Sequence, residues 1–118
     1  MSATISHEDV GEDLRRIMIT GRLDTQGTNA ISNELRELCE TQRRGIVVDL
    51  SAVEFAASIA IGQLIVNAKA VKNRGGHMVL IASGTSIVMM SLTTTGIDKV
   101  IPVFQYAPDA YVSALRGF

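Results

Sequence analysis

Apolar and polar positions along the chain follow the repeats expected for strands separated by helices. The expected strands are Thr4–Val10, Leu14–Thr20, Ile46–Leu50, His77–Ala82 and a short Val100–Phe104. In the second of these, Ile17 and Ile19 fall on one face. The third and fourth are apolar at nearly every position, which is typical of strands that are buried on both faces.

Helical spacing of apolar residues fills the intervals between these strands. The expected helices run from about Thr25 to Gln42, Ser58 to Asn73, Thr85 to Thr94 and Pro108 to Leu115, and the expected connections include Gly21–Asp24 and Ser51–Ala57. The first helix has its expected core face at Ile31, Leu35, Leu38 and Gln42. The second has it at Ile61, Leu64, Ile65 and Ala68, with Gln63, Asn67, Lys69 and Lys72 toward water.

The order of these elements predicts the fold class. After an opening hairpin, strands alternate with helices, which indicates an α/β fold with a mixed sheet of four to five strands. About four helices should pack mainly on one face of that sheet. No repeat, linker or low-complexity tract divides the sequence, so residues 1–118 are expected to form a single domain.

Charge and composition exclude several classes of function. The 11 basic and 12 acidic side chains leave a net charge of −1, which gives no field to attract a nucleic-acid backbone. The 20 residues from 78 to 97 carry no charge, but Gly84, Gly96 and many hydroxyl groups interrupt them, so a buried strand and a helix are expected there instead of a membrane span. The lone Cys39 has no partner for an internal disulfide and fits a reducing, cytoplasmic compartment.

No set of residues in the sequence points to catalysis. The two histidines, His7 and His77, stand outside any metal-binding or triad motif, and no Lys-Ser/Thr pair follows Gly75-Gly76 as a phosphate loop would require. We therefore expect a protein that is not an enzyme and that needs no cofactor or metal.

Ser58 is the residue with the most chemical interest, because it lies where a connection gives way to a helix. One interpretation is an N-cap, since serine is a preferred capping residue. The other is a phosphoacceptor, since the helix dipole favours a phosphate at this position. The two interpretations are compatible, and for both we expect an accessible side chain.

Several short motifs, in this order and spacing, resemble the bacterial STAS-domain family, and most closely its small stand-alone anti-sigma factor antagonists. The resemblance covers nearly the whole chain. The motifs are Gly21-Arg22-Leu23-Asp24, Ile46-Val-Val-Asp-Leu50 with Val53-Glu-Phe55, Ala57-Ser58-Ile59-Ala60-Ile61-Gly62, Arg74-Gly75-Gly76 and Thr95-Gly96-Ile97-Asp98-Lys99-Val100.

The resemblance implies a partner-switching regulator of transcription. In that family a serine-kinase anti-sigma factor binds the antagonist and phosphorylates the first serine of the third motif, which is Ser58 here, and a phosphatase can reverse the modification. The implied docking residues are Asp24, Phe55, Ala57, Ser58, Ile59, Gln63 and Asn67.

Two departures from the family pattern keep an alternative open. Ala57 replaces the usual acidic residue before the serine, and Ile59-Ala60 replaces the usual Ser/Thr-Gly pair. The alternative is a scaffold or accessory STAS subunit of a stress-signalling or lipid-transport complex.

A third departure lies in the helix expected at Thr85–Thr94, where Ile87, Met89 and Met90 replace residues that are usually charged in the family. They form either a slightly shifted core or an exposed apolar patch. With an exposed patch of that size, we expect a monomer or a weak homodimer.

Overall fold

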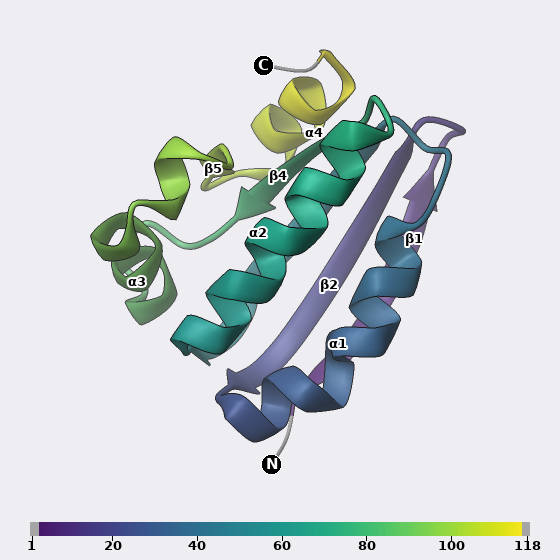
Figure 1. Cartoon of the computed structure of the whole chain (residues 1–118). Helices are drawn as coiled ribbons and strands as arrows, with labels where there is room; N and C mark the ends of the chain where they lie inside the picture. The colour runs from purple at the N-terminus through teal and green to yellow at the C-terminus, as the bar shows by residue number, and fades with distance from the viewer. Residues whose placement is uncertain (1–2, 117–118) are drawn as a thin grey trace.

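A five-stranded sheet in the order β1-β2-β3-β4-β5 forms the centre of the molecule in the computed structural model, which describes residues 3–116 (Figure 1). The strands are β1 (Thr4–Val10), β2 (Leu14–Leu23), β3 (Gly45–Ala56), β4 (His77–Ile81) and β5 (Val103–Phe104). The helices are α1 (Thr25–Cys39), α2 (Ser58–Asn73), α3 (Ile87–Thr95) and α4 (Ala107–Arg116), with a short 3₁₀ turn at Ile97–Lys99. The predicted α/β class and mixed sheet are confirmed.

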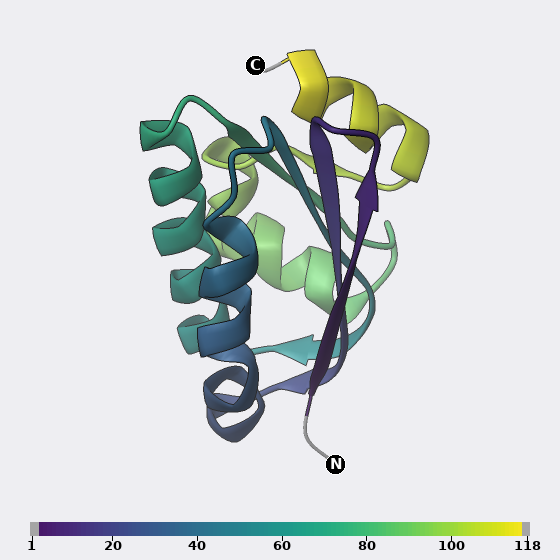
Figure 2. The same ribbon diagram turned by 90° about the vertical axis from the view of Figure 1, so that its right-hand side faces the viewer.

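The strand order explains why most helices share one face. β1 and β2 are antiparallel, and every later neighbouring pair is parallel. Crossovers between parallel strands are right-handed, and the strand order never reverses, so α1, α2 and α3 must all lie on the same side. α4 follows the last strand and is free of this constraint, and Figure 2 shows it on the opposite side from α1 and α2.

The main core lies between the sheet and its three-helix face. Ile17 and Ile19 of β2 point into it, as predicted, together with alternate residues of β3 and β4. The other residues of β3 and β4 meet α4, where Ala110 and Ala114 pack against Val47. Because helices cover both faces here, all residues from 46 to 50 are buried, as the unbroken apolar run indicates.

Two strands extend further than the sequence predicts. β2 continues to Leu23 and β3 to Ala56, so the connections expected at Gly21–Asp24 and Ser51–Ala57 are mostly strand. The parallel pairing of β2 with β3 holds both segments extended, and shifts of register beside Thr20 and at Gly21 absorb the irregular residues. Gly21 has φ +94°, which favours glycine at such a bulge. Long-range pairing therefore overrides the local preference for a turn.

The helix boundaries also differ from the predictions. α1 ends at Cys39, where the N–H of Glu40 donates to the carbonyl groups of Arg36 and Glu37, so Gln42 is exposed and outside the helix. α3 begins at Ile87, two residues later than predicted, because Ser86 caps it through a 3.0 Å bond from the Met89 N–H. α4 runs from Ala107 to Arg116, one residue longer at each end, and β5 begins only at Val103.

The core face of α2 is rotated from its predicted position. Ile61 and Leu64 are buried as predicted, whereas Ile65 and Ala68 are only half-buried and Val71 is fully inside. Asn67, predicted to face water, is 3% exposed. Its side-chain N–H donates to the Gln63 carbonyl at 2.8 Å, which satisfies the buried amide within its own helix.

A partly buried polar cluster joins α4 to the sheet. Arg16 of β2 donates to the Asp49 carboxylate of β3 at 2.5 Å and to the Tyr111 hydroxyl of α4 at 3.0 Å. The other Asp49 oxygen accepts from the backbone and hydroxyl groups of Ser51. Burial by itself raises the pKa of Asp49, but the bonds from Ser51 and Arg16 outweigh it, so this pKa lies below its ordinary value of 3.8.

Asp49→Asn should destabilise the fold at neutral pH and have a smaller effect in acid. The substitution removes the charge that Arg16 faces, which costs roughly 1.5–3 kcal/mol for a hydrogen-bonded charged group. A carboxyl group with a lowered pKa contributes stability above its unfolded pKa of about 3.9 and loses it as the pH falls through the folded pKa. Urea unfolding at pH 7 and pH 3 measures both effects.

Glu12→Gln is the control, because Glu12 is exposed in the turn between β1 and β2. The free energy of unfolding of Glu12→Gln should equal that of the wild type at pH 7 and at pH 3. An equal loss for Asp49→Asn at pH 7 and pH 3 would show that the charge of Asp49 contributes nothing.

Candidate functional site

The carboxyl ends of β2 and β3 meet the start of α2 at one edge of the sheet. Leu23 pairs with Ala56, and the Ala57 N–H then donates to the Leu23 carbonyl at 2.9 Å. α1 starts beside them, and Gly27 allows its close approach, because a Cβ there would collide with the carbonyl oxygen of Arg22. This edge is where open α/β sheets generally place their binding sites.

Ser58 is the first residue of α2 and does not cap it, which corrects one of the sequence-based interpretations. The N-cap is Ala57, with extended backbone (φ −78°, ψ 168°), and it supplies no side-chain bond to the helix. The reason is the length of β3, which continues to Ala56 and leaves only Ala57 to join strand to helix. The Ser58 side chain is exposed, as expected, and none of its hydrogen-bonding capacity is used for a cap.

A shallow pocket of about 440 Å³ opens beside Ser58, between the start of α2 and α3. The residues that line it are Phe55, Ala56, Ala57, Ser58, Ile61, Ile87, Met90, Ser91, Thr94 and Thr95. In the described part of the chain, the lining side chains are apolar or carry hydroxyl groups, and none is charged. Just outside, the guanidinium of Arg22 lies over the Phe55 ring, 4.9 Å from its centroid.

The remaining predicted docking residues have different surroundings. Ile59 is 37% exposed and points outward from the first turn of α2. Asp24 is half-buried, and its carboxylate caps α1 by accepting from the Gly27 N–H at 2.7 Å. Gln63 is half-buried, while Asn67, at 3% exposure, has almost no surface to offer a partner.

The orientation of α3 decides whether its apolar residues form a shifted core or an exposed patch. Ile87 and Met90 are 61% and 65% exposed, while Met89 is half-buried and packs against the core. Val88 and Leu92 are buried and form the core face of α3. Both alternatives are therefore partly correct, and the exposed pair borders the Ser58 pocket. We define the docking surface as Phe55, Ala57, Ser58, Ile59, Ile87 and Met90.

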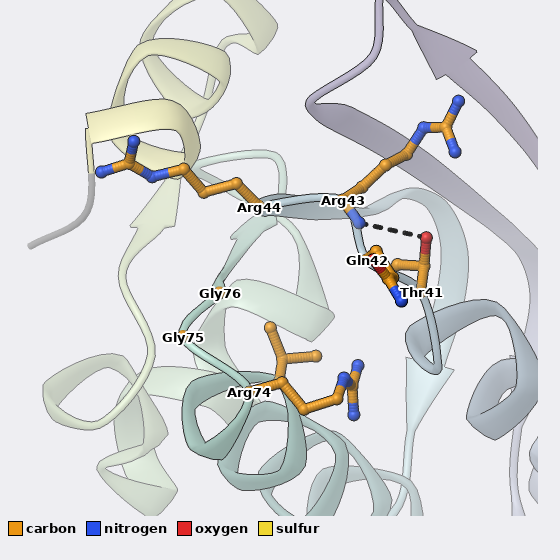
Figure 3. Close-up of a pocket in the computed structure, with 8 residues that line it drawn as sticks. Thr41, Gln42, Arg43, Arg44, Arg74, Gly75 and Gly76 are labelled. Carbon is orange, nitrogen blue, oxygen red and sulfur yellow. Dashed lines mark hydrogen bonds between the residues drawn. The ribbon is translucent and has the colours of Figure 1, made fainter.

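A second pocket, of about 330 Å³, lies at the opposite ends of β3 and β4 and contains three arginines (Figure 3). Figure 3 shows Arg43 and Arg44 pointing in different directions, away from Gly75 and Gly76. Arg43 faces Asp9 at 3.4 Å, and Arg74 donates to the Cys39 carbonyl. Because these guanidinium groups diverge and two of them have partners, the pocket does not form an anion site.

The described residues give little indication of a reactive thiol, a metal site or a membrane-spanning helix. Burial raises the pKa of the Cys39 thiol to about 12, so the reactive thiolate form is scarce at neutral pH. Within residues 3–116 there is no group of three or more His, Cys, Asp or Glu side chains placed to hold a metal ion. In the same range, no helix has the length and apolar character needed to cross a bilayer.

Comparison with known proteins matches this fold to one family. The family model for the STAS domain matches residues 8–110. An anti-sigma factor antagonist from Mycobacterium paratuberculosis has 25% identity and a TM-score of 0.85, over 98% of this chain and 96% of that one. A STAS domain protein from Planctomyces limnophilus has 20% identity and a TM-score of 0.71, over 97% and 98%. The phosphorylated form of the Bacillus protein SpoIIAA has 14% identity and a TM-score of 0.65, over 93% and 97%.

Lysine substitutions at the neighbouring methionines Met89 and Met90 of α3 should have unequal effects on stability. Met90→Lys places a charge in water and should change the free energy of unfolding by no more than about 0.5 kcal/mol. Met89→Lys places a charge against the core and should cost at least about 1 kcal/mol. Urea denaturation of the two variants side by side measures the difference, and equal costs would contradict the orientation of α3.

Proposed function

The chain belongs to the STAS domain family, and we propose that it acts as an anti-sigma factor antagonist controlled by phosphorylation of Ser58. Its partner would be a kinase-like anti-sigma factor, which releases its sigma factor when it binds this chain in the cytoplasm. A phosphatase would restore the unmodified form. The observation that carries the proposal is an exposed serine at the start of a helix, beside an uncharged pocket.

The docking surface has the character of a contact site for another protein. Ile87 and Met90 expose apolar side chains at an uncharged pocket, and Ile59 exposes another from the first turn of α2, next to Ser58. Clustered exposed apolar side chains are uncommon on a protein without a partner, and an interface core is typically depleted of charge. These side chains therefore support binding of a partner at the end of the sheet where Ser58 lies.

Phosphorylation would change this surface without unfolding it. The Ser58 Oγ attacks the terminal phosphorus of ATP held by the kinase, an O–P bond forms, the P–O bond to ADP breaks, and a base of the kinase takes the hydroxyl proton. The phosphate adds a charge of about −1.5 to −2, which the N-terminal end of the α2 dipole stabilises. At an apolar contact the same charge loses its water, so the complex should dissociate.

The relatives support this function. One is described as an anti-sigma factor antagonist, and SpoIIAA exists in a phosphorylated form. In the STAS family the modified serine lies in the motif to which Ala57-Ser58-Ile59 corresponds here, and of these three residues Ser58 keeps the family pattern.

A scaffold or accessory STAS subunit is the second candidate, and the two departures around Ser58 favour it. Ala57 removes an acidic residue that kinase recognition could use, and Ile59 makes the docking surface more apolar. Such a subunit would keep a permanent partner at the same surface. In both roles the chain is not an enzyme, and its own self-association is weak or absent.

Incubation with the cognate kinase-like anti-sigma factor and ATP should add one phosphate, about 80 Da, to the intact mass. The adduct should be absent in Ser58→Ala and present in Ser91→Ala, which removes another hydroxyl from the same pocket. Absence of the adduct in the wild type would contradict phosphorylation control and favour the scaffold role. The gene neighbourhood of the chain identifies the kinase to be used.

Ser58→Asp should weaken binding to this partner at least tenfold, or about 1.4 kcal/mol, while Ser58→Ala binds as the wild type does. The melting temperature should stay close to that of the wild type, because a negative charge at a helix start is favourable by about 0.3–1 kcal/mol. Calorimetric titration and thermal unfolding measure the two effects.

The matched control is Asn73→Asp, which adds the same charge at the exposed far end of α2. It should leave affinity unchanged. If Ser58→Asp binds as tightly as this control, the partner docks elsewhere.

A further inference from the structure

Arg22 has an unusual position beside the proposed phosphorylation site. Its side chain is exposed, and its guanidinium lies over the ring of Phe55, 4.9 Å from the centroid. Phe55 in turn lines the same pocket as Ser58. Among residues 3–116, Arg22 has no acidic partner, so the ring is the contact that holds its guanidinium.

The sheet register brings Arg22 to the same edge as Ser58. Arg22 pairs with Phe55 across β2 and β3, and the next residue, Leu23, accepts the hydrogen bond from Ala57. Arg22, near the end of β2, and Ser58, the first residue of α2, are therefore each one residue from that hydrogen bond. An arginine side chain is long and flexible enough to turn from the ring toward a group on Ser58.

The other charged side chains at this edge, Asp24 and Glu54, are acidic, so a phosphate on Ser58 would depend on Arg22 for a positive charge. Asp24 follows β2 and is committed to the cap of α1, and Glu54 precedes Phe55 on β3 with an exposed carboxylate. Both are negative and would oppose a phosphate on Ser58. α3 contributes hydroxyl and apolar side chains without charge to the pocket. Among these charged residues Arg22 is the cation, and its contact with Phe55 brings it to the border of the Ser58 pocket.

We infer that Arg22 binds the phosphate of modified Ser58 and leaves the Phe55 ring when it does so. This inference rests on the proposed function for the natural occurrence of the phosphate. A cation–π contact at an exposed site is weak, whereas a guanidinium donates two charge-assisted hydrogen bonds to a phosphate. Phosphorylation then changes the docking surface twice, because it adds charge at Ser58 and uncovers Phe55.

The test uses full-length chain with phosphoserine incorporated at position 58 during translation, so that no kinase is needed. Phosphorus NMR follows the second ionisation of the phosphate, which has a pKa of about 6 in a free phosphoserine. A nearby guanidinium favours the doubly charged form, so the pKa should be lower in the wild type than in Arg22→Gln by about 0.3 or more. Arg22→Lys, which keeps the charge, should retain part of this difference.

Arg36→Gln is the matched control, because Arg36 is an exposed arginine of α1 whose acidic neighbour, Glu40, lies 3.9 Å away. Its phosphate pKa should equal that of the wild type. The Phe55 ring resonances should also move further on phosphorylation in the wild type than in Arg22→Gln, where no guanidinium lies over the ring beforehand.

Equal phosphate pKa values in the wild type and Arg22→Gln, or unmoved Phe55 resonances in the phosphorylated wild type, would overturn the role of Arg22. That result would leave the proposed function intact, since its own failure is the absence of a kinase-dependent adduct on Ser58. Should Arg22→Gln fail to fold, Arg22→Met, which also removes the guanidinium, takes its place in the same titration.

Discussion

The parallel pairing of β2 with β3 is the constraint on which the rest of the structure depends. It runs from Leu14 opposite Gly45 to Leu23 opposite Ala56, and it holds extended two segments whose local sequence favours turns. This pairing sets the length of β3, and the length of β3 sets where α2 begins. Ser58 is consequently the first residue of its helix, with Arg22 and Phe55 paired beside it.

The packed core and the candidate site lie in different parts of the molecule. The Arg16–Asp49 pair and Tyr111 fix α4 to the sheet, and the apolar centre of β3 is covered on both faces. The Ser58 edge has an alanine as N-cap, an uncharged pocket and exposed apolar side chains of α3. A change of charge at such an edge leaves the core undisturbed, which suits the exchange of partners proposed above.

Local sequence patterns point to Ser58, Ile87 and Met90 of the candidate site, but not to Arg22. Ser58 stood out because hydroxyl residues at helix starts are recognisable locally, and Ile87 and Met90 stood out because they replace charged positions. Arg22 gave no such signal, since its contact with Phe55 joins residues that are distant in the sequence. Asn67 was placed in water because a polar residue on a helix usually faces it, yet the rotation of α2 buries it.

The sequence by itself determined the fold class, the order of the elements and the strands at the centre of the sheet, because unbroken apolar runs and helical spacing are local properties of the chain. The tertiary structure alone decided where β2 and β3 end, which residue precedes α2 and which side of α3 is exposed. These features depend on pairing and packing between distant segments, whose free energy exceeds the local preferences of residues such as Gly21 and Ser51.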